Sequence, residues 1–338
     1  MKVLVTGATS GLGRNAAQYL LEHGAEVIAT GRNREQGAQL RDAGATFIPL
    51  DLALATPGEC AALAAGCDAV WHCAARSSPW GDKALFRQIN VQATQMLAQA
   101  AVAAGVPKFV HISTPAVYFD FQHHYDLPET YRAKTFACHY ALSKYEAEKV
   151  ITETAANAGS ATFIILRPRG LFGPHDNVIL PRLLRQIQRD SGVLRLPRRG
   201  ETLLDLTFVQ NVVHAMMLAT QKDGLRSGSI YNVTNHQPQP LADMLDALLK
   251  QELGLRYTIR SVPWPVLSLA ARGMELAGKC SGKEPALTRY SAGTVCFDMT
   301  LNTRKAADEL GYTPRFSLED GIALTGEWLR TDGKNNGI

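Results

Sequence analysis

The sequence predicts an α/β protein with a doubly wound parallel sheet and a smaller C-terminal α/β domain. Two observations support this fold class. Short apolar runs rich in β-branched residues alternate with longer stretches of helical periodicity, which is typical of parallel strands buried on both faces. The first such run, residues 2–6, leads through a glycine-rich turn directly into a helical pattern, the order found where a sheet binds a nucleotide.

Composition narrows the class of protein. The 338 residues suffice for a main domain and a smaller second one. No wholly apolar run approaches the roughly 20 residues that cross a bilayer, and the N-terminus lacks the basic-then-apolar order of a signal peptide. We therefore expect a cytoplasmic protein without stable membrane insertion. The net charge of +4 is spread along the chain and does not indicate a nucleic-acid partner.

The sequence predicts no metal site. The six cysteines lack the paired spacing of zinc sites and are expected to be free thiols. His123 and His124 are adjacent in a loop-like stretch, so their side chains would point in different directions rather than share an ion.

The glycine turn predicts a site for the pyrophosphate of a dinucleotide. Glycine lets the backbone turn tightly and approach a diphosphate, and the N-terminus of the following helix favours an anion. The residues expected to bind it are Gly7, Thr9, Ser10, Gly11, Leu12 and Gly13. A loop that only turns the chain is the alternative, and the flanking strand and helix argue against it.

The end of the second strand, residues 26–30, favours NADP(H) as the cofactor, with NAD(H) as the alternative. NAD is commonly held there by an acidic residue, but the chain continues with Gly31 and Arg32. An arginine fork suits a 2′-phosphate, so Arg32 is the predicted ligand, with Arg14 or Arg34 as helpers. The competing interpretation is that Arg32 is a solvated loop residue.

The third and fourth strands, residues 46–50 and 69–73, end in residues that fit a cofactor lying across the sheet. Cys73, Ala74 and Ala75 are small and leave room for its ribose and diphosphate. In the loop that follows, Trp80 either lines a substrate pocket or anchors the loop.

Two side chains beyond the fifth strand, residues 108–113, predict acid–base chemistry. Tyr140 and Lys144 are four residues apart in a helical pattern, so both emerge on one face, one turn from each other. An ammonium close to a phenol stabilises the phenolate and would lower its pKa from about 10. Tyr140 would then exchange a proton with a carbonyl or alcohol oxygen, which the hydroxyl of Thr114 would hold.

In this order the motifs resemble the extended short-chain dehydrogenase/reductases of the NAD(P)-dependent epimerase/dehydratase superfamily. Within them the chain is similar to the 3β-hydroxysteroid dehydrogenase-like and 2-alkyl-3-oxoalkanoate reductase-like branch. The resemblance rests on TGATSGLG at 6–13, ISTPAVY at 112–118, the Tyr140/Lys144 pair and LRPRGLFGPHD at 166–176. The glycine spacing departs from it, because it is that of the shorter members.

The resemblance implies a Rossmann fold and a role for each matching residue. Thr114, Tyr140 and Lys144 would be catalytic, with Tyr140 and Lys144 also touching the cofactor. Asp51 would meet the adenine edge. The remaining cofactor contacts would come from Leu52, Cys73, Ala74, Ala75, Asn90, Pro168 and Leu171. A homodimer through the helices at 86–104 and 137–158 is the family's expectation.

The segment at 203–209, LLDLTFV, resembles that of the steroid dehydrogenase branch and predicts an apolar carbonyl or alcohol substrate. Sugar-nucleotide epimerases carry an arginine immediately before the Asp-Phe pair to hold a diphosphate, whereas this chain has Leu204 before Asp205. The predicted reaction is the interconversion of a ketone and a secondary alcohol. Sugar-nucleotide epimerisation or dehydration and a catalytically silent NADP sensor are the alternatives.

The predicted nucleotide domain covers residues 1–168, with 201–224 returning to it, and the substrate domain covers 169–200 and 225–330. In the substrate domain, Arg182, Arg185 and Arg189 share a helix face that is either solvated or attracts an anionic substrate. The apolar-rich helix at 262–278 could roof a pocket, pack in the core or rest on a membrane, and we favour pocket or core.

Overall fold

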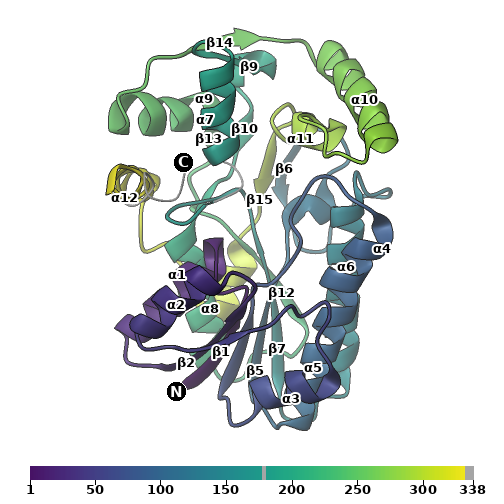
Figure 1. Cartoon of the computed structure of the whole chain (residues 1–338), viewed down its shortest axis with the longest axis vertical. Coiled ribbons are helices and arrows are strands. Elements are labelled where there is room, and N and C mark those ends of the chain that lie inside the picture. The colour runs from purple at the N-terminus through teal and green to yellow at the C-terminus, as the bar shows by residue number, and fades with distance from the viewer. Residues whose placement is uncertain (177–179, 332–338) are drawn as a thin grey trace.

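The computed structural model describes residues 1–176 and 180–331, and in these ranges it has a seven-stranded parallel sheet at its centre (Figure 1). Its strands are β1 (Lys2–Thr6), β2 (Glu26–Gly31), β3 (Thr46–Pro49), β4 (Ala69–His72), β5 (Lys108–Ile112), β7 (Thr162–Pro168) and β12 (Ser229–Val233). They are ordered β12-β7-β5-β4-β1-β2-β3, so the direction of winding changes between β1 and β4. A crevice at such a switch point is where α/β sheets bind ligands.

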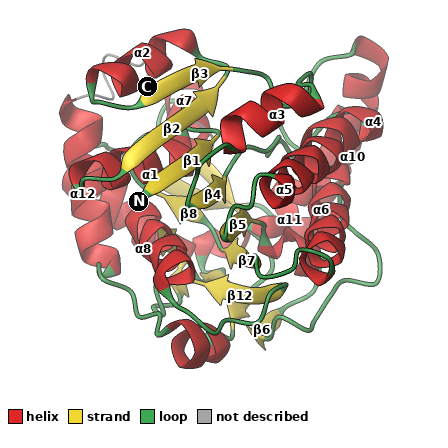
Figure 2. Ribbon diagram, turned by 90° about the horizontal axis from the view of Figure 1, so that it is seen from below, coloured by secondary structure: helices red, strands yellow, loops and turns green. Residues whose placement is uncertain are grey.

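Helices cover both faces of this sheet, as Figure 2 shows. One layer consists of α1 (Gly11–Glu22), α2 (Arg34–Asp42) and α8 (Val209–Gln221), which share a core with Val3, Val5 and Trp71. The other consists of α3 (Pro57–Ala64), α5 (Ala93–Ala103) and α6 (His139–Ala156), which pack on Leu4 and Val70. Neighbouring residues of β1 and β4 thus serve opposite cores, because side chains alternate along a strand. The prediction of a doubly wound parallel sheet is confirmed.

Two helices are interrupted by wider turns. The helix expected over 86–104 begins earlier as α4 (Lys83–Phe86), passes through a π-helical turn at Arg87–Gln92 and continues as α5. A second helix, α9 (Leu241–Leu245), is likewise followed by a π-helical turn at Asp246–Glu252. Such turns insert a residue into the helical repeat, which the apolar pattern did not reveal.

Smaller elements lie at the end of the molecule away from the N-terminus (Figure 1). These elements include three small sheets. The first has four strands in the order β13 (Gln239–Pro240), β10 (Leu203–Leu204), β15 (Met299–Leu301) and β6 (His124–Leu127). The second pairs β11 (Thr207–Phe208) with β8 (Leu171–Phe172), and the third pairs β14 (Thr258–Ser261) with β9 (Val193–Leu196). The other helices are α7 (Leu180–Arg189), α10 (Trp264–Ser281), α11 (Arg289–Thr294) and α12 (Leu318–Thr331). The predicted domain division differs at β12, assigned above to the substrate domain, because this strand pairs with β7 along the edge of the large sheet.

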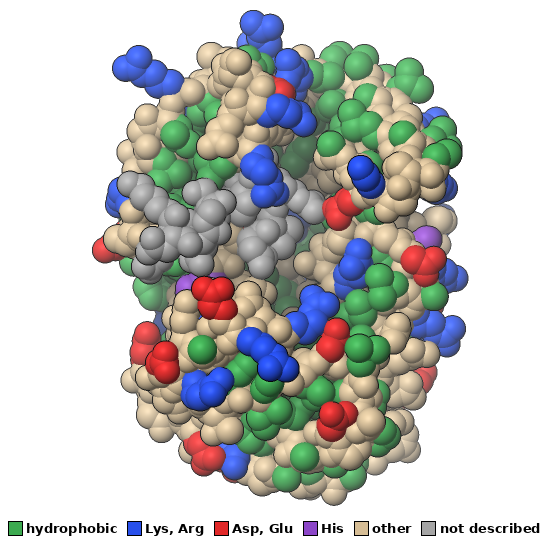
Figure 3. Space-filling view, viewed as in Figure 1, with side chains coloured by type: hydrophobic (Ala, Val, Ile, Leu, Met, Phe, Trp, Pro, Cys, Tyr) green, Lys and Arg blue, Asp and Glu red, His purple; other side chains and the backbone are tan. Residues whose placement is uncertain are grey.

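Most of α10 does not pack in the core, which corrects one of the two alternatives favoured for it. Val266, Leu269 and Leu276 are 56%, 71% and 63% exposed, and of this fully described helix only Ala271 and Gly278 are buried. Figure 3 shows hydrophobic side chains over the region where Figure 1 draws α10. No helix within the described residues meets the length and apolarity needed to cross a membrane.

A buried ion pair joins α6 to the large sheet. Glu148 of α6 accepts two hydrogen bonds from Arg167 of β7, Nε to Oε1 at 2.7 Å and Nη2 to Oε2 at 2.6 Å. Ser113, at the end of β5, donates its hydroxyl to the same carboxylate, and Arg167 also donates to the Tyr118 hydroxyl at 2.6 Å. Glu148 and Arg167 are 3% and 4% exposed, so neither charge has water as a substitute partner.

Replacing Glu148 by Ala is therefore expected to lower the free energy of unfolding by about 3–5 kcal/mol, because it strands a buried guanidinium. Urea denaturation measures the loss. Glu153→Ala, an exposed glutamate on the same helix, is the matched control and should change it by less than about 0.5 kcal/mol. Equal effects of the two variants would contradict this assignment.

Two buried histidines lie in the central strands. His72 of β4 hydrogen-bonds Thr6 through Nδ1 and Thr94 through Nε2, each at 2.8 Å. Burial, helped by the charge of Lys144, lowers the pKa of His72 to about 3. The pKa of His111 in β5 is lowered well below its ordinary value for the same two reasons.

These histidines predict acid sensitivity. Each is neutral in the folded chain but takes up a proton when unfolded, so the stability it contributes is present above its unfolded pKa of about 6.5 and is lost as the pH falls below it. For His72 we expect a loss of about 2 kcal/mol from about pH 7 to about pH 5, measured by urea denaturation. His72→Gln should remove that part of the pH dependence; an unchanged slope would reject the explanation.

Candidate active site

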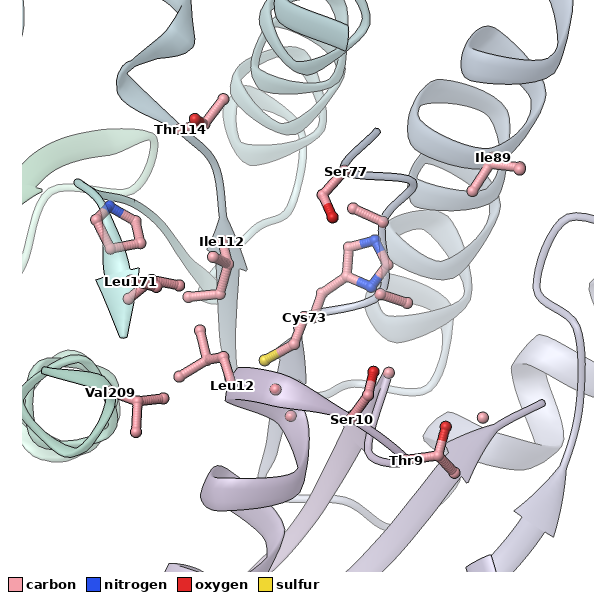
Figure 4. A pocket seen from close by; sticks show the side chains of 18 of the residues that line it. Thr9, Ser10, Leu12, Cys73, Ser77, Ile89, Ile112, Thr114, Leu171 and Val209 are labelled. Atoms are coloured by element: carbon pink, nitrogen blue, oxygen red, sulfur yellow. The ribbon is translucent and has the colours of Figure 1, made fainter. Parts of the chain in front are cut away.

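A cavity of about 410 Å³ opens at the carboxyl edge of the large sheet. Its walls come from the turn between β1 and α1, the ends of β2 to β5, the start of α6 and residues 168–176. Figure 4 shows Thr9, Ser10 and Cys73 on one side of it and Thr114, Ile112 and Leu171 on the other. The cavity thus extends over the switch point between β1 and β4.

The glycine turn packs so closely against neighbouring backbone that no side chain would fit at Gly7 or Gly13. Gly7 has a φ of +67°, and a Cβ there would lie 2.9 Å from Cα of Ala74, while a Cβ on Gly13 would lie 2.3 Å from the Gly7 carbonyl oxygen. Ser10 at the start of α1 makes no side-chain cap, and the Gly11 amide donates to the His175 carbonyl at 3.1 Å. This close-packed turn before a helix N-terminus fits the pyrophosphate of a dinucleotide.

The structure brings most of the predicted residues together, and the exceptions are Asn90 and the helper arginines Arg14 and Arg34. Those that line the cavity are Gly7, Thr9, Ser10, Gly11, Leu12, Gly13, Arg32, Asp51, Leu52, Cys73, Ala74, Ala75, Thr114, Tyr140, Lys144, Pro168 and Leu171. Asn90 does not. Its amide accepts from the backbone N–H of Arg76 at 2.7 Å and donates to the Ser143 hydroxyl at 2.9 Å, so it fixes the loop after β4 to α6.

Other lining residues were missed by the sequence analysis. They include Ser77, Ile89, Ile112, Phe172, Gly173, Asp176 and Val209. Several of them are one or two positions in sequence from a predicted residue, and this closeness in sequence is the signal that could have identified them. Val209 is the last residue of the segment at 203–209 quoted above, and it reaches the cavity because α8 packs against α1, far away in the sequence.

The arginines predicted to bind a 2′-phosphate are not equivalent. Arg32 lines the cavity, and its Nη1 lies 3.8 Å from Oδ2 of Asp51 in a largely exposed pair. Arg14 is buried against α2, donating to the Gln36 carbonyl at 2.6 Å, and Arg34 lies outside the cavity lining. Arg14 is thus a packing residue, and Arg32 alone of the three faces the cavity.

Tyr140 sits beside Thr114 with a phenol that is harder to ionise than expected. Burial raises the pKa of Tyr140 to about 12, although its hydrogen bond with the Thr114 side chain acts in the opposite direction. The sequence analysis expected the nearby ammonium to lower this pKa. In the structure burial dominates, and Lys144 is not among the groups that shift the phenol.

Lys144 is held from below the cavity. Its ammonium donates to the Ile112 carbonyl at 2.6 Å and lies 3.1 Å from Nε2 of His111. Burial lowers the pKa of Lys144 to about 8, against the opposing charge of Glu148. Because His111 stays neutral, its ring can accept a hydrogen bond from the lysine.

Other residues considered in the sequence analysis have structural roles. Ser113 also lines the cavity, but its hydroxyl donates to Glu148, whereas the side chain of Thr114 hydrogen-bonds Tyr140. Trp80 packs near Gly278 of α10, as expected of a loop anchor. His123 and His124 bind Asp298 and Asp120 separately, and no cluster of possible metal ligands occurs among the described residues.

The predicted arginine face of α7 is not a cluster aimed at the cavity. Arg185 is exposed and Arg189 pairs with Asp190 at 3.0 Å, which favours the solvated interpretation. The side chain of Arg182 lies outside the described residues.

Comparison with known proteins agrees with this geometry. The chain is 46% identical over 336 residues to an uncharacterized protein of Escherichia coli (strain K12), YbjS, covering 99% of each chain. It is 31% identical over 341 residues to the 2-alkyl-3-oxoalkanoate reductase of Stenotrophomonas maltophilia (strain K279a), covering 95% of this chain and 97% of that one. The solved structure of MoeE5 in complex with UDP-glucuronic acid and NAD has the same fold, with a TM-score of 0.75, 24% identity and coverage of 98% and 99%.

The family assignment follows from the match over the sheet and its cavity. The model of the NAD dependent epimerase/dehydratase family matches residues 3–234, which include the glycine turn, Thr114, Tyr140 and Lys144. The chain belongs to the NAD dependent epimerase/dehydratase family.

Proposed function

We propose that this protein is an NADP(H)-dependent oxidoreductase that interconverts a ketone and a secondary alcohol on a largely apolar substrate. Its family makes it an NAD(P)-dependent enzyme, and oxidoreductases are among its relatives. The observation that carries the proposal is that Thr114, Tyr140 and Lys144 line the same cavity as the glycine turn. A dinucleotide held by that turn would extend along the strand ends toward these side chains.

The cofactor supplies the hydride, and the chain's own residues handle the oxygen of the substrate. Tyr140 donates a proton to the carbonyl oxygen as the carbonyl carbon receives hydride, or accepts a proton from the alcohol oxygen in the reverse direction. The Thr114 hydroxyl holds the same oxygen by a hydrogen bond. Lys144 is held beneath the site by the Ile112 carbonyl, and because burial lowers its pKa only to about 8 it keeps a positive charge near neutral pH.

An apolar substrate is supported by the segment that follows β9. Leu204 is 5% exposed, where sugar-nucleotide enzymes resembling this chain would need a charged side chain for a diphosphate. Ile112 and Leu171, which line the cavity on the same side as Thr114 in Figure 4, are apolar. Epimerisation or dehydration of a sugar nucleotide is the alternative, and it would proceed without net consumption of NADPH.

The reaction is tested by loss of NADPH absorbance with a panel of apolar 3-oxo acids, steroids and sugar nucleotides. Tyr140→Phe should lower kcat by at least about 100-fold because it removes the proton donor. Its Kd for NADPH should stay within about threefold, because the cavity is otherwise unchanged. Turnover of a UDP- or dTDP-sugar without NADPH loss would favour the epimerase alternative, and binding of NADPH with no turnover of any compound would favour a sensor.

Cofactor preference is tested at Arg32. We expect Arg32→Ala to lower the ratio of kcat/KM for NADPH to that for NADH by roughly 10- to 100-fold, because a charge-assisted hydrogen bond to the 2′-phosphate is lost. Arg34→Ala is the control, since Arg34 lies two residues away and outside the cavity lining. An unchanged ratio in the Arg32 variant would reject the assignment.

A further inference from the structure

The helix α10 carries a hydrophobic surface that no part of the described chain covers. Val266, Leu269, Met274 and Leu276 are four of the ten large hydrophobic side chains that are exposed among the residues the structure describes. Single exposed hydrophobic residues are ordinary, but several on one helix form a patch that marks an interaction site. No residue of α10 lines the cavity, so the reaction proposed above does not account for this patch.

The two faces of α10 differ in what they contact. The inner face packs on the protein: Ala271 and Gly278 are buried, and the Trp264 ring lies 5.1 Å from the Phe297 ring. The outer face is a continuous apolar stripe whose residues recur at intervals of three or four. The members of this α10 stripe, all exposed, are Val266, Leu269, Ala270, Gly273, Leu276 and Ala277.

Positive charge borders the α10 stripe. Arg272 lies one turn from both Leu269 and Leu276, and Lys279 follows it two turns later along the same side of the helix. Both are exposed, and their side chains form no ion pair within the described residues. Of the eight charged residues between positions 256 and 289, six are basic and two are acidic. This excess equals the +4 of the whole chain, so the rest of the sequence is balanced in charge.

The two acidic residues of this segment are bound by the protein. Glu275 accepts from the backbone N–H of Arg289 at 2.7 Å, and Glu284 accepts from the Ser78 hydroxyl at 3.3 Å. Neither carboxylate therefore offsets the basic side chains beside the stripe. The exposed surface of α10 is apolar with a basic border, which complements a surface that is apolar inside and anionic outside.

An anionic lipid surface fits these features better than a second copy of the chain. A symmetric contact between two α10 helices would bring two surfaces of the same positive charge together. A bilayer instead offers acyl chains to the stripe and negative head groups to the basic border, the combination that holds an amphipathic helix in the plane of a membrane. Figure 1 shows α10 at the edge of the molecule, where such a surface can reach it.

We infer that α10 docks this protein peripherally on a membrane surface that contains anionic lipid. The α10 stripe would lie at the acyl boundary, with Arg272 and Lys279 among the head groups. The loop after β4 connects this surface to the cavity, because Trp80 packs near Gly278 and the neighbouring Ser77 lines the cavity. Docking would thus bring one wall of the cavity close to the bilayer. The inference does not depend on the proposed reaction, because binding is measured without turnover.

The test is sedimentation of the full chain with sucrose-loaded vesicles. The vesicles contain phosphatidylcholine alone, or phosphatidylcholine with about 30% phosphatidylglycerol as the anionic lipid. We expect the partition coefficient at about 0.1 M salt to be at least about tenfold higher on the anionic vesicles. Raising the salt concentration should lower it, because the head-group charge is then screened.

Two double variants separate the apolar and the basic contributions. Leu269→Gln with Leu276→Gln should lower the partition coefficient on anionic vesicles by about 10- to 100-fold, because less apolar surface leaves water. Arg272→Gln with Lys279→Gln should lower it by about 10- to 30-fold, toward the value for neutral vesicles. All four side chains are exposed, so the Tm of each variant should stay close to that of the wild type.

The matched control is Leu54→Gln with Leu324→Gln, two leucines that are 75% and 39% exposed on other parts of the protein. It should change the partition coefficient by less than about threefold. A wild type that stays in the supernatant, equal binding to neutral and anionic vesicles, or an equal loss in the control would overturn the inference. Light scattering supplies the remaining outcome: a dimer that the Leu269/Leu276 variant dissociates, without vesicle binding by the wild type, would assign the stripe to a second copy instead.

Discussion

The ion pair between Glu148 and Arg167 is the contact on which the geometry of the site depends. Tyr140, Lys144 and Glu148 follow one another at intervals of four and share one face of α6. Because Glu148 is bound to Arg167 of β7 and to Ser113 after β5, the rotation of α6 about its axis is fixed relative to both strand ends. Tyr140 and Lys144 are then aimed at the cavity by an interaction one and two turns away from them.

Burial decides how charge is distributed beneath the cavity. Lys144 is the cation, while His72 and His111 stay neutral because burial and the lysine's own charge both lower their pKa values. The ammonium of Lys144 is hydrogen-bonded by a neutral imidazole, that of His111, and by the Ile112 carbonyl, so it needs no hydrogen bond from a buried carboxylate. The charge of Lys144 is thus held by His111 and the Ile112 carbonyl, and burial raises the pKa of Tyr140.

Local chemistry made much of the fold and the cofactor site predictable. The glycine turn, the strand-end residues Cys73 to Ala75 and the four-residue spacing of Tyr140 and Lys144 each follow from neighbours in the sequence, and all of them line one cavity. What could not be predicted depends on contacts between distant segments. Three examples are the pairing of β12 with β7, the burial of Arg14 against α2 and the exposure of α10. Each is decided by which elements pack against one another, and the type of a single residue does not predict that packing.

Arg167 and Arg169 show the same dependence on contacts between distant segments. Both belong to the quoted segment at 166–176, and nothing in their order predicts that they have different partners. The difference arises where β7 ends: Arg167 is still within the strand and is bound by Glu148 of α6, whereas Arg169 lies past the strand and donates to the Met299 carbonyl of β15. The partner of each arginine is therefore decided by the element that packs against its position, because the two side chains themselves are identical.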